Sequence, residues 1–343
     1  MMHSCCCRST LLFLFLSIIT ATIHQASAFH TNNQVTSMMS SAKKQKPNDD
    51  VDKDPLHEIR AGFIGCGTIA SAIATSLARP EHEEYLSEAG LSLSTISVTK
   101  RSASKSSKLK ENFPKVVSIY ESAEEVVRNS DLVFLCVLPQ QVDEMLSELK
   151  EKRTWDSDRH TLVSLVSTSK VEDLVEKTSL PTNRVFKMIC LPPISNREGC
   201  ALLTPLASCE NGHPYLKKMF DALGGVVECP TDEIMSSMMV PTGLMGTMYG
   251  IMKNNRDWLI NKGVSPSDAS YFVARSYLSM VQDAERDCRD PKRFDDLIEE
   301  QTPGGLNEQA LKNQEKQGVF DAYDKSMEAV LSRIQGKSDG SLP

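Results

Sequence analysis

A glycine-rich turn near residue 65 has the residue types and spacing of a dinucleotide-binding site. Gly65, Gly67 and Ala70 follow the pattern G-x-G-x-x-A, directly after the apolar run "IRAGFI" and at the start of the amphipathic run "TIASAIATSLA". The first glycine permits a tight turn, the second lets the backbone approach a pyrophosphate, and the small third residue allows close helix packing. Backbone N–H groups at the helix N-terminus then bind the anion. The alternative is a tight βα turn without a ligand.

Basic side chains stand where the second strand is expected to end. Sites for NAD usually place Asp or Glu there, against the ribose 2′-hydroxyl. This chain has Lys100, Arg101 and Ser102 instead, with Lys105 nearby. Two cations and a hydroxyl suit a 2′-phosphate, so the sequence predicts NADP(H) in preference to NAD(H). A solvated basic loop would have the same sequence pattern.

Two stretches late in the chain could bind a carboxylate. One is "TPGGLNEQ" at 302–309, where Gly304 and Gly305 precede a long amphipathic run, and the other is Thr242-Gly243 within a Met-rich run. Free N–H groups at a helix N-terminus bind an anion without a charged side chain, and Thr242 and Asn307 could add side-chain donors. A helix N-terminal turn without a ligand has the same pattern.

The histidines and tryptophans form no recognisable reactive centre. Four histidines outside the N-terminal segment have no Cys, Asp or His at metal-ligand spacing, which predicts neither a metal site nor a catalytic triad. We expect these histidines to be solvated: His57, His82, His160 and His213. Trp155 and Trp258 are expected to be packing residues.

The cysteines argue against a disulfide framework. Three of the ten lie at 5–7, and the other seven are scattered without a C-x-x-C pair. An odd number at irregular spacing predicts neither disulfides nor a zinc site, and it favours a reducing compartment over secretion.

Short apolar runs alternate with helix-like runs between Ile59 and about residue 190. The strand candidates are four to eight residues long and rich in β-branched or aromatic side chains: "IRAGFI", "LSTISVT", "VVSIY", "DLVFLCV", "TLVSLVS" and "RVFKMIC". Amphipathic runs such as "QQVDEMLSELKEK" separate them. This alternation predicts an α/β fold of the Rossmann type, with a doubly wound, mostly parallel sheet over residues 56–229.

Beyond Pro230 the alternation stops, and an all-α domain is predicted over 230–336, followed by a disordered tail at 337–343. Helices are expected at about 231–262, 266–288, 292–301 and 306–334. The Met-rich first helix is apolar on too many faces to stand alone in water. It should be buried within the domain or in a homodimer or higher homo-oligomer.

The N-terminal segment has the layout of a targeting sequence. Arg8 precedes the apolar run "LLFLFLSII", and "ASA" at 26–28 follows, as in a signal peptide over 1–28. That apolar run is too short for a stable membrane anchor, so no membrane association is expected after its removal. Residues 29–55 begin with a stretch that lacks acidic residues up to Asp49, which is typical of a transit peptide.

The charge of the remaining chain limits its partners. Removal of residues 1–48 takes away four basic residues and no acidic one, which leaves 34 basic against 45 acidic side chains and a net charge of −11. An acidic body of this kind argues against nucleic-acid binding.

With these motifs in order, the chain from about Ile59 to Ile334 resembles the pyrroline-5-carboxylate reductase family. The resemblance rests on "GFIGCGTIASAI", "TKRS", "SDLVFLCVLP", "LVSLVST", "RVFKMICLPPISNREGCALLTP" and "TPGG". It implies a Rossmann domain, a helical dimerisation domain and reduction of a cyclic imine carboxylate by NAD(P)H. The join "ASAF" similarly resembles the bipartite presequences of complex plastids. Plastid import is therefore expected, with secretion as the alternative.

The resemblance also implies roles for individual residues. Besides Gly65, Gly67, Ala70 and the basic residues after the second strand, the cofactor would contact Thr68, Ile69, Ser122, Cys136, Val137, Leu138, Pro139, Ser167 and Thr168. The substrate would lie at Thr242, Gly243, Gly304, Gly305, Leu306 and Asn307, with Thr242 and Asn307 as the candidate catalytic side chains.

Several motifs depart from the family pattern close to the expected substrate. Val137-Leu138-Pro139 replaces Val-Lys-Pro, and Leu306-Asn307 stands where the family has threonine after Pro-Gly-Gly. Two alternatives therefore remain. One is an imine or β-hydroxyacid reductase for another small carboxylate, although Lys253 lies one residue later than the hydroxyacid pattern requires, a turn of ~100° on a helix. The other is a non-catalytic NADP-binding protein.

Overall fold

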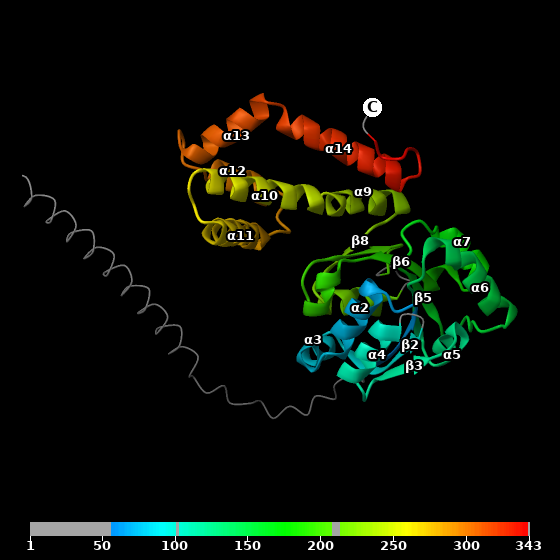
Figure 1. Cartoon of the computed structure of the whole chain (residues 1–343). Helices are drawn as coiled ribbons and strands as arrows, with labels where there is room; N and C mark the ends of the chain where they lie inside the picture. Colours follow the sequence, from blue (N-terminus) through cyan, green and yellow to red (C-terminus); the bar gives the residue numbers. More distant parts are fainter. Residues whose placement is uncertain (1–55, 101–102, 208–212, 342–343) are drawn as a thin grey trace, which may run out of the picture. The chain divides into compact units, whose positions relative to one another are not determined.

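The structure is a computed structural model that describes residues 56–100, 103–207 and 213–341 (Figure 1). The predicted signal and transit peptides, as well as Arg101 and Ser102, lie outside the described residues. The predicted fold class is confirmed, because an eight-stranded, mostly parallel sheet with helices on both faces is followed by helices alone. Within the described ranges no helix has the length and hydropathy that crossing a bilayer requires.

The sheet has the strand order β3-β2-β1-β4-β5-β6-β7-β8. All neighbouring pairs are parallel except β6 and β7. The antiparallel strand β7, "ALLT", and the short β8 add to the six strands predicted from apolar runs. The strands are β1 (His57–Ile64), β2 (Leu91–Thr99), β3 (Val117–Tyr120), β4 (Leu132–Leu135), β5 (Thr161–Ser164), β6 (Val185–Ile189), β7 (Ala201–Thr204) and β8 (Val226–Glu228).

Two apolar cores cover the two faces of the sheet. One core joins the sheet to α2 (Thr68–Ala78), α3 (Glu83–Glu88), α4 (Ala103–Asn112) and α8 (Pro214–Ala222), and Phe63, Phe134 and Phe220 lie at its centre. The other joins it to α5 (Ala123–Arg128), α6 (Val142–Glu151) and α7 (Val171–Thr178). Because β1 leads to β2 on one side and pairs with β4 on the other, the strand order reverses between β1 and β4. Ligands of such sheets bind at that point, beyond the carboxyl ends of the strands.

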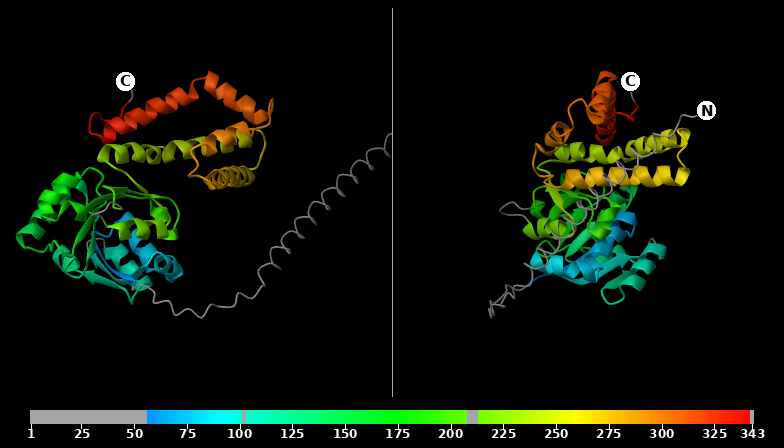
Figure 2. Two further views of the ribbon diagram at one scale, coloured as in Figure 1. Left: turned by 180° about the vertical axis from the view of Figure 1, so that it is seen from behind. Right: turned by 90° about the vertical axis from the view of Figure 1, so that its left-hand side faces the viewer.

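The part after β8 consists of α9 (Asp232–Gly243), α10 (Met245–Asn261), α11 (Pro266–Glu285), α12 (Arg293–Glu299), α13 (Leu306–Lys316) and α14 (Val319–Ile334). Helix α10 packs beside α11, and α14 packs beside α9 (Figures 1 and 2). Two predicted helices are in fact divided. The run at 231–262 breaks at Leu244, just after Pro241 and Gly243, which weaken a helix. The run at 306–334 breaks at Gly318, whose φ of 70° is left-handed.

Several side chains lie in environments that the sequence did not predict. His82 and His160 are buried rather than solvated, and His213 is partly buried. His82 Nδ1 lies 2.8 Å from the carbonyl oxygen of Ser76 on α2, so this ring fixes α3 to α2. Trp155 packs in the second core as predicted, but the side chain of Trp258 is 58% exposed in the single chain.

Candidate cofactor and substrate site

The turn after β1 requires glycine at its first position. Gly65 has a φ of 96°, and a Cβ there would lie 2.4 Å from the carbonyl oxygen of Cys136 at the end of β4. Its N–H donates to Thr99 Oγ1 at 2.8 Å, which fixes the turn to the end of β2. Any side chain at residue 65 would therefore force the ends of β1 and β4 apart.

The second glycine leaves open space over the helix N-terminus. Gly67 is the N-cap of α2 and has no side chain to cap it, and a Cβ built there would meet nothing within 4 Å. Ala70 is buried against the sheet, as a small third residue requires. The first N–H groups of α2 therefore face a space in which an anion could approach the backbone.

A cavity of about 390 Å³ lies at this point of the sheet. Its lining comes from the β1–α2 turn, the ends of β4, β5 and β6, and one residue of α9. The lining residues are Gly67, Thr68, Ile69, Ala70, Cys136, Val137, Leu165, Ser167, Met188, Ile189, Cys190 and Met239. Seven predicted cofactor residues are therefore brought together: Gly67, Thr68, Ile69, Ala70, Cys136, Val137 and Ser167. We call this space the cofactor cavity.

Among the residues that the structure describes, the lining of the cofactor cavity includes no side chain that is charged at neutral pH. The titratable groups among these described lining residues are the thiols of Cys136 and Cys190. Burial raises the pKa of the Cys190 thiol to about 12 and that of the Cys136 thiol well above its usual value. Both groups are therefore neutral and poorly nucleophilic. A cavity of this kind can enclose an apolar ring, but it supplies no strong acid or base.

Several residues predicted to contact the ribose end of the cofactor lie outside the lining of the cofactor cavity. Lys105 Nζ donates to Thr68 Oγ1 at 2.6 Å, which places a cation beside the start of α2. Lys100 forms an exposed ion pair with Glu121 at 2.6 Å. Ser122 caps α5, because its Oγ accepts from the Glu125 N–H and donates to the Glu125 carboxylate. A cofactor contact by Ser122 would compete with that cap.

Two further predicted cofactor residues lie outside the lining of the cofactor cavity. The exposed side chain of Leu138 points away from the core, and Pro139 begins a short 3₁₀ turn before α6. Only the first half of the predicted Cys136–Pro139 loop therefore lines this cavity.

A second, polar cavity of about 460 Å³ adjoins the first at Ser167. It contains Thr168, and its walls come from the loop after β5, from β6, from the start of α9 and from the end of α14. Lys187 of β6 is only 5% exposed, and its Nζ lies 2.9 Å from Asp232 Oδ1 at the start of α9. The sequence interpretation did not identify Lys187 as a site residue. The clue in the sequence is that this lysine interrupts the apolar run "RVFKMIC", which predicts a buried strand.

The Thr242-Gly243 pair ends α9, away from both cavities. Thr242 Oγ1 donates to the Met239 carbonyl at 2.6 Å, so its hydroxyl is engaged within the helix. Gly243 allows close packing on α14, because a Cβ would lie 3.2 Å from Val330 Cγ1. It is Met239, one turn earlier, that reaches the cofactor cavity.

The Pro-Gly-Gly turn begins α13 as predicted. Gly304 has a φ of 72°, and Gly305 is the N-cap, where a Cβ would lie 2.7 Å from the Thr302 carbonyl oxygen. The Gly304 N–H donates to the Glu308 carboxylate, and Asn307 Nδ2 donates to Gln301 Oε1 at 2.7 Å. Leu306 is 84% exposed.

None of the residues of this turn lines either of the two cavities, as far as the described ranges show. A single chain therefore does not bring Asn307 to the cofactor cavity. Lys253, the candidate of the hydroxyacid pattern, is exposed on α10 and paired with Asp257 at 2.5 Å, as a surface lysine would be.

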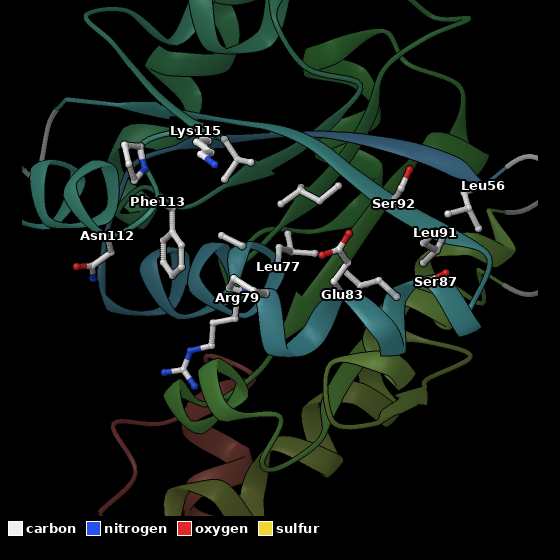
Figure 3. Close-up of a pocket in the computed structure, with 16 residues that line it drawn as sticks. Leu56, Leu77, Arg79, Glu83, Ser87, Leu91, Ser92, Asn112, Phe113 and Lys115 are labelled. Carbon is white, nitrogen blue, oxygen red and sulfur yellow. The ribbon is translucent and has the colours of Figure 1, made fainter.

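A third cavity, of about 480 Å³, lies at the start of β2, the end of this strand away from the cofactor cavity (Figure 3). Leu77 of α2, Leu91 of β2 and Phe113 after α4 form its apolar walls, while Arg79 and Glu83 stand among its polar groups. The start of β2 forms one wall, so this cavity is separated from the cofactor cavity by the length of the strands.

Comparison with known proteins identifies the relatives of this chain. The family model "NADP oxidoreductase coenzyme F420-dependent" matches residues 60–168. A pyrroline-5-carboxylate reductase from Arabidopsis thaliana is 27% identical over 194 residues, which cover 56% of this chain and 63% of that relative. The chain thus matches less than two thirds of the length of this relative.

Solved structures share the fold. A pyrroline-5-carboxylate reductase from Coxiella burnetii superposes with a TM-score of 0.67 at 20% identity, covering 82% of this chain and 98% of the other. The Plasmodium falciparum pyrroline carboxylate reductase with NADP bound gives 0.62 at 18% identity, covering 83% and 100%. With the order of motifs and the cavity at the β1–β4 switch point, these similarities support a divergent relative of the pyrroline-5-carboxylate reductases.

Proposed function

We propose that this protein uses NADPH to reduce the C=N bond of a small cyclic imine carboxylate, 1-pyrroline-5-carboxylate, to proline. The observation that carries the proposal is the cofactor cavity, which has a dinucleotide turn on one side and, among its described lining residues, no acidic or basic side chain. A cyclic iminium already carries its proton in part of its population near neutral pH. Reduction of this substrate therefore needs positioning more than it needs a protein acid.

The residues of this chain would hold the cofactor and exclude water. The N–H groups after Gly67 would bind the pyrophosphate, and Leu165, Met188 and Met239 would form the apolar wall around the nicotinamide. When bound, the nicotinamide supplies the hydride. Ser167, at the boundary between the cofactor cavity and the polar cavity, offers a hydroxyl beside the reacting ring.

The preference for NADPH over NADH is supported by the cations beside this site. Lys105 lies against Thr68 at the start of α2, and Lys100 follows β2. No acidic residue stands directly at the end of β2, where a carboxylate would bind the 2′-hydroxyl of NAD. The NADP bound to the Plasmodium relative is consistent with this assignment.

We further propose a homodimer formed by the helical part. In the single chain, large apolar side chains are exposed along α10 and α11, among them Tyr249, Tyr271, Phe272, Met280 and Val281. Monomeric proteins rarely expose so much apolar surface. Helix α10 contains no buried residue, so burial within the domain does not account for its apolar side chains. The partner would cover this surface and bring its exposed Leu306-Asn307 turn to the cofactor cavity.

Import into a plastid stays part of the proposal, supported by the "ASAF" join and the transit-like composition of residues 29–48. A fluorescent protein fused behind residues 1–55 and expressed in an alga with complex plastids should enter the plastid. Export to the medium would favour secretion.

The enzymatic proposal is tested with protein that lacks residues 1–48. Added 1-pyrroline-5-carboxylate should cause NADPH oxidation and the formation of proline. NADPH oxidation only with other imines or with oxo acids would show that the substrate is another small carboxylate. NADPH binding without turnover on any of them would favour a non-catalytic protein.

A further inference from the structure

One residue of the helical part enters the described lining of the cofactor cavity. The other lining residues belong to the sheet part, whereas Met239 lies on α9. Met235 and Met239 stand four residues apart and share the face of α9 that is turned to the sheet, while Met238 is rotated by ~100° and is 41% exposed. We propose that Met239 sets the size of the ring that the enzyme reduces, an inference that rests on the proposed reductase function.

Packing holds Met239 at the cavity. Its side chain is partly buried and packs, with that of Ile189 on β6, against a small core of Leu202, Cys229 and Met235. Helix α9 as a whole packs against β7. A ligand that enters the cofactor cavity therefore meets a wall that is already in place, and the side chain that forms this wall is not free in solvent.

The proposed reaction brings the substrate to this wall. Reduction requires the imine carbon to lie within reach of the nicotinamide, at about 3–3.5 Å in a productive complex. The apolar residues proposed to surround the nicotinamide include Met239. A ring held at that distance from the nicotinamide therefore contacts the same methionine.

A methionine wall selects a ring by its size and not by its charge. The thioether is apolar, and its sulfur is only a weak hydrogen-bond acceptor. The cofactor cavity measures about 390 Å³, at the lower end of the roughly 300–1,000 Å³ of small-molecule sites. A nicotinamide and a five-membered ring therefore leave little room for another methylene. One methylene in an apolar pocket changes the specificity of an enzyme by roughly 10–200-fold.

The test compares two substrates in the full-length protein and its variants. The ratio kcat/KM is measured with NADPH for 1-pyrroline-5-carboxylate and for its six-membered homologue, 1-piperideine-6-carboxylate. The parent protein should favour the five-membered ring by about tenfold or more. Met239→Ala opens the wall and should shift this preference towards the six-membered ring by about tenfold or more. Met239→Val should shift it the same way to a smaller extent, and it serves if the alanine variant does not fold.

Two control variants separate ring size from the stability of the helix. Met238→Ala makes the same change at an exposed neighbour outside the lining of the cofactor cavity, and it should leave the preference unchanged. Met239→Leu keeps nearly the same side-chain volume and should keep the preference of the parent protein. An unchanged preference in both Met239→Ala and Met239→Val, or an equal shift in Met238→Ala, would overturn the proposal.

Binding of the saturated rings gives a readout that needs no turnover. Calorimetric titration of the protein, saturated with NADP⁺, should show tighter binding of proline than of piperidine-2-carboxylate, and Met239→Ala should shift this order towards the larger ring. If neither imine is reduced, the proposed function fails, while a shifted binding order still supports the role of Met239. Reduction of 1-pyrroline-5-carboxylate with unchanged kinetic and binding preferences in Met239→Ala would overturn the role of Met239 alone. Absence of both turnover and ring binding would overturn both.

Discussion

Lys187 Nζ lies 2.9 Å from Asp232 Oδ1, and this ion pair joins β6 of the sheet to the first turn of α9. Lys187 is buried, whereas the side chain of Asp232 is 28% exposed. Helix α9 carries Met239 into the cofactor cavity two turns later. The pair therefore fixes the direction of the helix that closes this cavity.

Removal of the lysine should destabilise the protein. We expect Lys187→Met to lower the free energy of unfolding by about 1–3 kcal/mol, less than the 3–5 typical of a fully buried pair, because water reaches Asp232. The double variant Lys187→Met/Asp232→Asn should recover part of this loss, since no unpaired charge remains. Urea unfolding of the single and double variants measures the coupling. Equal stability of the parent and Lys187→Met proteins would show that the pair does not fix α9.

The two glycines of the cofactor turn should respond differently to alanine. In Gly65→Ala the new Cβ meets the Cys136 carbonyl oxygen and the positive φ is strained, so the melting temperature should fall and NADPH binding should be lost. Gly67→Ala meets no protein atom, so its melting temperature should stay near that of the parent while NADPH binding weakens by about tenfold or more. Thermal melts and fluorescence titration with NADPH separate the two effects. Unchanged NADPH affinity in Gly67→Ala would place the pyrophosphate elsewhere.

The sequence predicted the sheet and its cofactor turn because both depend on local patterns. The turn "GFIGCGTIA" requires glycine for steric reasons that are the same in every such fold, and the apolar runs of β1 to β6 leave little choice of element. Strand β7, which lies between β6 and the edge strand β8, was missed because four residues between two loops carry too weak a signal.

The candidate substrate residues depend on contacts that local patterns do not encode. Packing of α9 against β7 decides which of its side chains face the sheet. Met239 therefore reaches the cofactor cavity, whereas the Thr242 hydroxyl bonds to a carbonyl of its own helix. His160 reads as a polar loop residue, yet tertiary packing against Trp155 buries it. Lys187 was overlooked because a charge within an apolar strand acquires its partner, Asp232, from a distant segment.

Cofactor selectivity should depend on Lys105. Its amino group lies beside the start of α2, so Lys105→Glu should weaken NADPH binding about tenfold relative to NADH, or roughly 1.4 kcal/mol of discrimination. Arg101→Asp should act in the same direction. Lys108→Gln, an exposed position three residues further along α4, is the control. Titration with both cofactors tests the assignment, and an equal loss for NADH and NADPH would contradict a 2′-phosphate contact.

Stability should fall in mildly acidic solution because of His160. Burial and the nearby Arg159 lower the pKa of this imidazole from 6.5 to about 4. The unfolded chain therefore binds a proton more readily than the folded one. The contribution is fully present above pH 6.5 and is lost as the pH falls towards 4, by up to about 3 kcal/mol in total. His213, whose pKa burial also lowers to about 4, acts over the same range.

The variant His160→Asn tests the pH effect. Asparagine can keep an acceptor for the Asp156 N–H, which His160 Nδ1 accepts at 2.9 Å, but it does not titrate. Urea unfolding at pH 7 and pH 5 should show a smaller loss of stability in His160→Asn than in the parent protein. Parallel losses in both proteins would assign the acid sensitivity to other groups.

The proposed dimer should depend on the apolar face of α11. Phe272 is exposed in the single chain beside Tyr271, and a glutamate at residue 272 would place a charge in the proposed interface. We expect Phe272→Glu to be monomeric by analytical ultracentrifugation at micromolar concentration, with reductase activity lost because the partner's Leu306-Asn307 turn is absent. NADPH binding should persist, since the cofactor cavity needs no partner residue. Leu206→Glu, on an exposed residue after β7, adds the same charge to the sheet part and should stay dimeric. A monomeric parent protein with full activity would show that one chain completes the site, and Asn307 would then have no role in it.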